Sequence, residues 1–146
     1  MTSPIEQREI FDHQAPANAT QMPRVFALGS RGPNGDNHAY YIETINVEKH
    51  PLYDQLVEFA DSVDDTQGDG LIMTFQQGSP AEGWNGVTIE ALLAIAYDRL
   101  NGCQAGPYAC SENANAMCAI SSALGYLHHR TWNREARDNP QNQPTD

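Results

Sequence analysis

The chain has 146 residues, 40% of them hydrophobic, with 19 acidic residues against 8 basic ones and a net charge of −11. This length fits one domain with a packed core, and no apolar run approaches the roughly 20 residues that cross a bilayer, so a soluble protein is expected. The negative charge argues against duplex nucleic acid and membranes as partners, because both are bound through spread-out Lys and Arg side chains.

Residues 1–22 contain several prolines, asparagines and glutamines with few apolar side chains, a composition that does not support a core. We expect a flexible N-terminal arm. The alternative is a segment that becomes ordered on a neighbouring subunit through Ile5, Ile10 and Phe11. The start of the chain also lacks the basic and apolar blocks of a secretory signal, so a cytoplasmic location is expected, with the cysteines reduced.

Residues 23–86 are expected to form a small α/β part of the domain. Strands are predicted where aromatic and β-branched side chains gather, at residues 24–28, 40–45 and 71–76. A short helix is predicted from Pro51 to Val63, because apolar residues recur at helical spacing and proline suits a first turn.

A glycine-rich loop follows the last predicted strand, at residues 76–86. Backbone amides in a loop of this kind suit contacts to anions and base edges. Its glycines match no Walker or dinucleotide-binding fingerprint, so no phosphate loop is predicted. A purely structural turn, in which Asn85-Gly86 tolerates positive φ, is an equal alternative to a ligand role.

Residues 87–138 are predicted to form a long helical hairpin, which makes the fold class α+β. Thr88 is the expected N-cap of the first helix, whose apolar face consists of Ile89, Leu92, Leu93, Ala96 and Leu100. The second helix is expected to begin near Pro107 and to pack through Met117, Ile120, Leu124 and Leu127. Residues 139–146 are predicted to be a disordered tail.

Three of the eight cations lie on one arc of the second helix: Arg130, Arg134 and Arg137. Arginine is suited to fork-shaped recognition of phosphate, so these residues predict a compact anion site. The alternative is that they only favour the negative end of the helix dipole or pair with Glu135 and Asp138, contacts worth about 0.3–1 kcal/mol each.

No catalytic constellation is apparent in the sequence. His128 and His129 point about 100° apart on a helix and do not form a metal-chelating pair. The carboxylates suited to acid–base work have no nucleophile paired with them: Glu82, Glu90 and Asp98. We therefore expect a binding protein, not an enzyme, with no metal and no cofactor.

Three segments together resemble one phage family: residues 74–88 (TFQQGSPAEGWNGVT), then Asp98-Arg99-Leu100 with residues 104–114 (QAGPYACSENA), then residues 127–137. They are similar to the Thoeris anti-defence sponge family and to its shorter helical relative, the anti-CBASS cyclic-nucleotide sponge. The resemblance extends from about Tyr40 to Arg137, so the N-terminal arm lies outside it.

This resemblance implies a non-catalytic, phage-encoded protein of the host cytoplasm that sequesters immune second messengers. Family members hold cyclic ADP-ribose isomers, and some also hold cyclic oligonucleotides, in pockets between the subunits of a homodimer or of a hexamer built as a trimer of dimers. By position, the expected ligand-binding residues are Phe75, Asn85, Arg99, Gly106, Tyr108, Arg130 and Arg134, with Cys110 at the same turn as Gly106 and Tyr108. Gln76 and Thr88 are also expected to bind the ligand. Two departures concern the cyclic-oligonucleotide pocket: Ser111 replaces a frequent basic residue, and Cys103 a frequent aromatic one.

The residue types agree with such a ligand, which presents an adenine face, ribose hydroxyls and a pyrophosphate. Phe75, Trp84 and Tyr108 are able to stack on a base, while carboxamides and arginines suit hydroxyls and phosphates. On sequence alone, however, Phe75 at a strand end is more often a core residue. The alternative functions are a structural or interaction module of a phage and a small nucleotide hydrolase.

Overall fold

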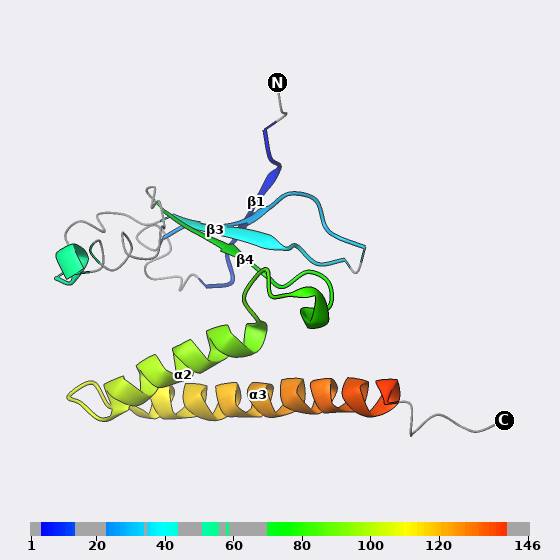
Figure 1. Ribbon diagram of the computed structural model, residues 1–146. Coiled ribbons are helices and arrows are strands. Elements are labelled where there is room, and N and C mark those ends of the chain that lie inside the picture. Colours follow the sequence, from blue (N-terminus) through cyan, green and yellow to red (C-terminus); the bar gives the residue numbers. More distant parts are fainter. Residues whose placement is uncertain are drawn as a thin grey trace. The chain divides into compact units, whose positions relative to one another are not determined.

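The computed structural model describes residues 4–13, 23–33, 35–43, 51–55, 58 and 70–139. The chain divides into two compact units, Met1–Val87 and Thr88–Asp146. The first unit contains a four-stranded antiparallel sheet, and the second contains two long helices (Figure 1). The predicted α+β class, with a small antiparallel sheet followed by a helical hairpin, is confirmed.

The strands lie in the sheet in chain order, as β1 (Gln7–Ile10), β2 (Val25–Leu28), β3 (Ala39–Glu43) and β4 (Gly70–Thr74). Each neighbouring pair is antiparallel, so residues opposite one another share a face. One row across the sheet consists of Arg8, Ala27, Tyr40 and Met73. Ala27 is 1% exposed and is the one apolar residue fully buried among those described, so the packing of the sheet centres on this row.

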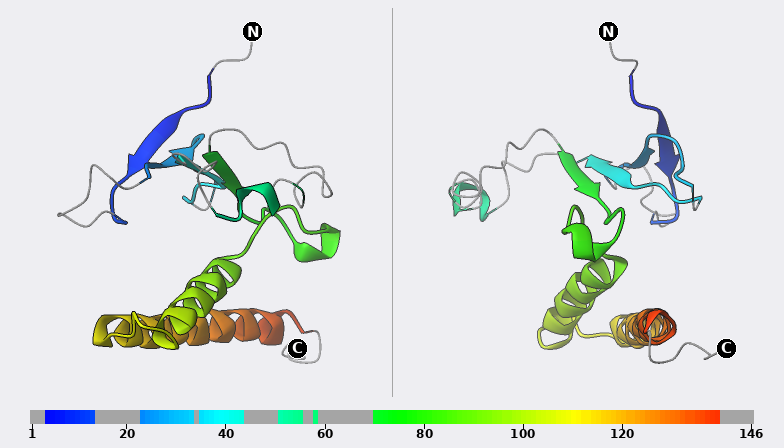
Figure 2. Two further views of the ribbon diagram at one scale, coloured as in Figure 1. Left: turned by 90° about the vertical axis from the view of Figure 1, so that its left-hand side faces the viewer. Right: turned by 45° about the vertical axis from the view of Figure 1, so that its right-hand side comes forward.

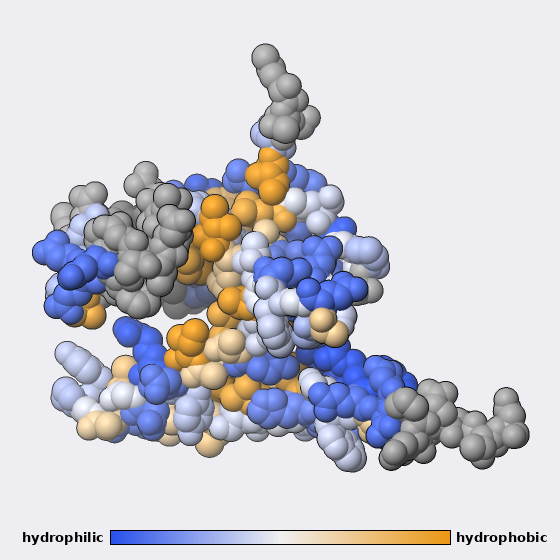
Figure 3. Space-filling model, viewed as in Figure 1, coloured by the Kyte–Doolittle hydropathy of each residue, from blue (hydrophilic) through white to orange (hydrophobic). Residues whose placement is uncertain are grey.

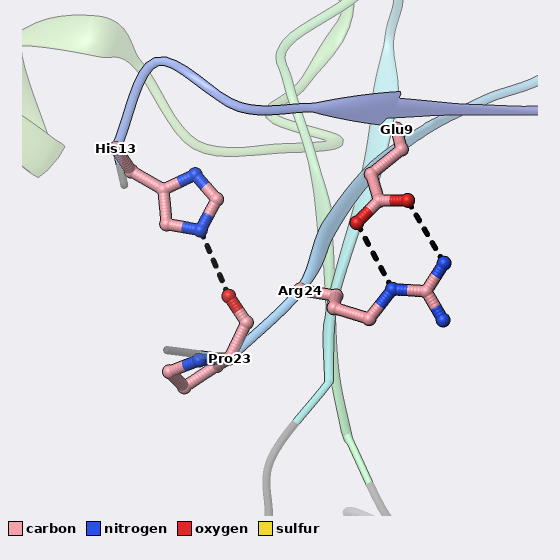
Figure 4. Close-up of polar contacts among 4 residues, drawn as sticks. All are labelled: Glu9, His13, Pro23 and Arg24. Atoms are coloured by element: carbon pink, nitrogen blue, oxygen red, sulfur yellow. Dashed lines mark hydrogen bonds and ion pairs between the residues drawn. The ribbon is translucent and has the colours of Figure 1, made fainter. Parts of the chain in front are cut away.

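Strand β1 corrects the sequence prediction, because it lies in the arm expected to be flexible. It pairs with β2 of the same chain, and Glu9 accepts two hydrogen bonds from the Arg24 guanidinium, at 2.8 and 2.9 Å (Figure 4). Gly29 N–H also donates to the Glu6 carbonyl at 2.8 Å. These contacts join residues far apart in the sequence, which is why the polar composition of the arm did not reveal them. Residues 14–22 lie outside the described part.

The three predicted strands are confirmed as β2, β3 and β4, with small changes of boundary. Each begins one residue away from its predicted start, at Val25, Ala39 and Gly70. The predicted end of the second strand, at residues 44–45, lies outside the described residues. Strand β4 ends at Thr74, whereas the prediction continued to Gln76. The predicted helix at residues 51–63 falls largely outside the described residues, but residues 53–55 and 58 are helical.

Apolar side chains also remain at the surface of the sheet. Leu71 and Ile72 of β4 are 49% and 67% exposed, and Figure 3 shows apolar surface over the strands. Among the described strands, β4 forms one edge of the sheet. An exposed edge with apolar side chains offers both backbone hydrogen bonds and apolar area to another chain.

The hairpin consists of α2 (Ile89–Gln104) and α3 (Ser111–Asp138), which run side by side in the views of Figures 1 and 2. Thr88 caps α2 as predicted, because its hydroxyl oxygen accepts from Ala91 N–H at 3.1 Å. Helix α3 stops at Asp138 with Arg137 in its last turn, which also agrees with the sequence. Within the described residues, no helix has the length and apolar character needed to cross a membrane.

The start of α3 differs from the prediction, because the helix begins at Ser111 and not near Pro107. The Gln104 carboxamide accepts from Cys110 N–H at 2.8 Å and donates to the Cys110 carbonyl at 3.0 Å, which closes the turn. Cys110 is then the N-cap, with its sulfur accepting from Asn113 N–H at 3.5 Å. Pro107 is therefore a turn residue.

The predicted apolar faces are confirmed on α3 and partly wrong on α2. On α3 the predicted residues are all half-buried: Met117, Ile120, Leu124 and Leu127. On α2 Leu92, Leu93 and Leu100 are half-buried, but Ile89 and Ala96 are exposed, and Tyr97 is covered instead. One neighbouring helix covers only a narrow arc, and neither helix contains a fully buried residue.

Candidate functional site

The candidate site in the first unit is the loop that follows β4. Its ends meet in an isolated parallel bridge between Phe75 and Val87. Gln76 N–H donates to the Val87 carbonyl at 3.0 Å, and Val87 N–H donates to the Thr74 carbonyl at 2.8 Å. The loop therefore leaves the sheet and returns to it at one place.

Gly86 is required here by close approach. A Cβ atom at this position would lie 2.4 Å from the Phe75 carbonyl carbon and 2.5 Å from the Thr74 carbonyl oxygen. Positive φ occurs in this loop at Gly78 and Gly83, not at Gly86. The explanation of Asn85-Gly86 as a turn with positive φ is therefore wrong, and Gly86 is needed so that the bridge can form.

Two carboxamide side chains hold the loop closed, and we call Gln76, Gln77, Gly83 and Asn85 the amide clasp. Asn85 Oδ1 accepts from Gln77 N–H at 2.8 Å, while Asn85 Nδ2 donates to the Gln77 carbonyl at 2.7 Å. Gln76 Oε1 accepts from Asn85 N–H at 2.8 Å, and Gln76 Nε2 donates to the Gly83 carbonyl at 3.2 Å. The loop is thus shaped by its own residues before any ligand binds.

The clasp changes what Gln76 and Asn85 offer to a ligand. A carboxamide has two N–H donors and two acceptor lone pairs, and in each of these side chains the clasp uses one of each kind. One donor and one acceptor remain on each residue for base edges or hydroxyls. Both residues therefore shape the loop as well as being expected ligand contacts.

The aromatic residues of the loop differ in their surroundings. Phe75 is half-buried and contacts Tyr40 edge-on, with ring centroids 5.5 Å apart and the planes 78° apart. Phe75 therefore takes part in the packing of the sheet, as the core alternative proposed. Trp84 is 68% exposed, and no ring contact or hydrogen bond of its side chain is found within the described residues.

In the second unit, the arginines make only weak contacts. Arg130 Nη2 lies 3.8 Å from Glu90 Oε1, which joins α3 to the first turn of α2. Arg134 Nη2 lies 3.5 Å from the Thr131 hydroxyl, at the limit of a hydrogen bond. Arg137 pairs locally, as the alternative to an anion site predicted, because its Nε lies 3.7 Å from Asp138 Oδ1.

The turn of the hairpin presents an exposed aromatic residue beside a carboxylate. Tyr108 is 79% exposed, and its carbonyl accepts from Asn113 Nδ2 at 3.3 Å. Gly106 N–H donates to the Cys103 carbonyl at 3.2 Å in the same turn.

The pKa of Glu112 is lowered by a hydrogen bond from its own backbone N–H, and then by bonds from Ser111 and Cys110. A negative charge therefore persists at the start of α3.

Six of the predicted ligand-binding residues belong to the hairpin, and they lie toward its two opposite ends. Thr88, Arg130 and Arg134 belong to the end where α2 begins, as the contact between Arg130 and Glu90 shows. Gly106 and Tyr108 are at the turn, and Arg99 is one and a half turns before the end of α2. One copy of the hairpin therefore does not bring these residues together.

The negative charge is unevenly distributed. The first unit has 13 acidic residues against 4 basic ones, whereas the second has 6 against 4. All the cations of the second unit are arginines: Arg99, Arg130, Arg134 and Arg137. The repulsion that an anionic ligand meets is thus weakest at the hairpin.

Sequence reasoning gave Glu112 no role and did not pair Glu90 with Arg130. It expected the Gln77 side chain to offer donors and acceptors to a ligand, whereas the structure uses the Gln77 backbone to close the loop. Glu90 meets Arg130 across two helices, and Glu112 has the first-turn position that many helical acids occupy. Among the described residues, no group of His, Cys, Asp and Glu is arranged to hold a metal ion.

Comparison with known proteins identifies the family. The family model described as "Acb2/Tad1, hairpin domain" matches residues 68–132, which include every predicted site residue except Arg134. The chain is also 36% identical over 95 residues to "Thoeris anti-defense 1" of Bacillus phage SBSphiJ7, an alignment that covers 60% of this chain and 67% of the relative. The clasped loop and the helical hairpin described above thus belong to a member of the phage Thoeris anti-defence family that carries the Acb2/Tad1 hairpin domain.

Proposed function

We propose that this anti-defence protein is a non-catalytic sponge that sequesters cyclic nucleotide second messengers, with cyclic ADP-ribose isomers as the main ligands. The observation that carries the proposal is the amide clasp, in the part of the chain that matches the family model. A loop that holds its shape without a ligand loses little conformational entropy on binding. This property suits a protein that must capture a scarce small molecule tightly.

The chemistry of the two units fits the parts of such a ligand. The loop offers aromatic rings for the adenine base. It also offers the carboxamide donors and acceptors that the clasp leaves unused, which suit the base edge and the ribose hydroxyls. The hairpin offers guanidinium groups for the pyrophosphate, and the contacts of Arg130 and Arg134 are long enough to be exchanged for phosphate oxygens.

We also propose that copies of the chain assemble as a homodimer or a trimer of dimers, with the pockets formed between subunits. Neither α2 nor α3 contains a buried residue, while large side chains such as Ile95, Tyr126 and Trp132 are exposed. A further copy would cover this surface. It would also supply arginines that one hairpin keeps at opposite ends.

Cyclic oligonucleotides are proposed as the second, weaker class of ligand. The charged Glu112 and the neutral Ser111 lie beside the turn that is expected to hold them. A carboxylate at this place opposes a phosphate, whereas the end of the hairpin with Arg130 and Arg134 is cationic. Cyclic ADP-ribose isomers are therefore the preferred class.

The test is an uptake and release experiment with the full chain. The protein is incubated with cyclic ADP-ribose isomers or with cyclic oligonucleotides, freed of unbound ligand, and then heated to unfold it. Chromatography of the released material distinguishes the functions, since intact ligand indicates a sponge and altered ligand indicates a hydrolase. No uptake would indicate an interaction module, and light scattering on the same sample measures the number of subunits.

A further inference from the structure

Trp84 is held from both sides by one side chain. Gln76 Oε1 accepts from the N–H of Asn85, the residue after Trp84, at 2.8 Å. Gln76 Nε2 donates to the carbonyl of Gly83, the residue before Trp84, at 3.2 Å. The Gln76 carboxamide therefore fixes the two peptide groups that flank Trp84, and the backbone of this residue has little freedom.

The chain before Trp84 is also constrained. Ser79 caps the short 3₁₀ helix η2 (Pro80–Glu82), and Gly83 N–H donates to the Pro80 carbonyl at 3.1 Å. Gly83 then adopts φ +113°, a conformation that favours glycine, and so redirects the chain into Trp84. The turn and the clasp together fix the backbone of Trp84 and so the direction of its Cα–Cβ bond.

The indole itself has no partner in the described part of the chain, although it is large and apolar. Trp132, the other tryptophan, has one ring face stacked on His129 at 6.0 Å. Trp84 has no such neighbour, and 68% of it is exposed. A tryptophan on a fixed backbone offers a wide flat surface at a low cost in conformational entropy, because only two side-chain angles remain to be fixed.

We propose that Trp84 is a base-stacking residue of the ligand site, and that Gln76 is the positioning residue that presents it. The inference rests on the proposed function, because Trp84 would bind the base of the same ligand. The matching chemistry is the face of a purine base in a phosphorylated nucleotide, since any π-face stacks on an indole. Gln76 thus acts on the ligand mainly through Trp84, because its carboxamide binds the peptide groups on both sides of that residue.

The test uses fluorescence of the full chain in a Trp132→Phe background, where Trp84 is the one remaining tryptophan. The probe is the cyclic ADP-ribose isomer mixture made by a TIR enzyme. Stacking should quench the Trp84 emission on titration. Adding Trp84→Leu should weaken binding, followed by titration calorimetry, by about tenfold or more, whereas Trp84→Phe retains a flat ring and should stay within about threefold.

Gln76 is tested by its effect on Trp84. Gln76→Leu removes both bonds to the flanking peptides, so the fluorescence anisotropy of Trp84 should fall and binding should weaken. Gln76→Glu keeps the acceptor for Asn85 N–H and should recover part of both. A purely structural role of Gln76 would leave the Trp84 anisotropy unchanged once the protein is folded.

The outcomes separate the two proposals. If the parent protein takes up the probe and Trp84→Leu binds it equally well, the stacking role of Trp84 is wrong while the sponge function stands. If the parent protein takes up neither this mixture nor cyclic oligonucleotides, both proposals are overturned. A weaker Trp84→Leu variant supports the inference only if its subunit number by light scattering is unchanged.

Discussion

Arg130 and Glu90 face each other across the hairpin, with 3.8 Å between Nη2 and Oε1. The side chain of Arg130 is 53% exposed, and a loose surface pair of this kind contributes at most about 1 kcal/mol to stability. If Arg130 binds a phosphate oxygen as proposed, the Glu90 carboxylate competes with that phosphate for the same guanidinium. Glu90 is therefore a competitor for Arg130 as well as its partner.

The first prediction concerns this competition. Glu90→Gln removes the negative charge and should strengthen binding of cyclic ADP-ribose isomers about two- to fivefold in titration calorimetry, with little change in unfolding. Asp98→Asn is the matched control, because it changes the net charge equally on the same helix and Asp98 forms no ion pair among the described residues. Weaker binding by Glu90→Gln would show that the carboxylate orients Arg130 and does not compete.

The second prediction concerns Arg134. The one hydrogen bond of its side chain within the described residues, to the Thr131 hydroxyl at 3.5 Å, is too long to hold the guanidinium, so Arg134→Ala should leave the fold and the oligomer intact. Ligand uptake should nevertheless be lost. Arg134→Lys should recover only part of it, because an ammonium does not make the two parallel bonds of a guanidinium fork. Arg31→Ala, a loss of the same charge in the first unit, should bind normally.

Much of the fold was predictable because its signals are local. The helical periodicity of α3 and the N-cap at Thr88 each depend on residues close together in the sequence, and both are confirmed. Strand β1 was missed, because the bonds from Arg24 to Glu9 join distant segments. The start of α3 was missed for a similar reason, because the Gln104 side chain extends the turn through bonds to Cys110.

The site was predictable in its residue types but not in its connections. Sequence reasoning selected Gln76 and Asn85 for their hydrogen-bonding groups, and the structure uses those groups first to close the loop. The same carboxamide suits a ligand or a backbone, so residue type alone does not distinguish these uses. Glu90 shows the same limit, because its partner Arg130 lies on the other helix.

The third prediction separates the two uses of Asn85. Asn85→Ala removes both bonds to Gln77 and should abolish ligand uptake while the oligomer persists. Asn85→Asp keeps the acceptor for Gln77 N–H but places a carboxylate against the Gln77 carbonyl, so the loop should also loosen. Hydrogen exchange at the Gln77 amide measures this loosening. Unchanged exchange together with lost uptake would mean that Asn85 acts only through the ligand.

The fourth prediction concerns pH. The hydrogen bond from Arg24 is the main cause that lowers the pKa of Glu9 below its ordinary 4.5. An acid with a lowered pKa stabilises the folded state above its unfolded pKa, and the contribution is lost as pH falls through the folded value. The difference in urea midpoint between the parent protein and Glu9→Gln should thus persist from neutral pH to about 4.5 and shrink below it. A difference that grows on acidification would contradict this assignment.

The fifth prediction concerns the bridge that closes the loop. In Gly86→Ala the new Cβ would lie 2.4 Å from the Phe75 carbonyl carbon, and backbone at this distance has little room to move. The bridge between Phe75 and Val87 should separate, with a loss of about 1–3 kcal/mol in unfolding free energy and of ligand uptake.

Gly102→Ala is the control, because nothing lies within 4 Å of its Cβ position in α2, and it should stabilise the protein by about 0.5–1 kcal/mol. Both are measured by urea unfolding at one protomer concentration, since self-association shifts the midpoint. If Gly86→Ala unfolds like the parent protein and still takes up ligand, the bridge is not what holds the loop in its binding shape.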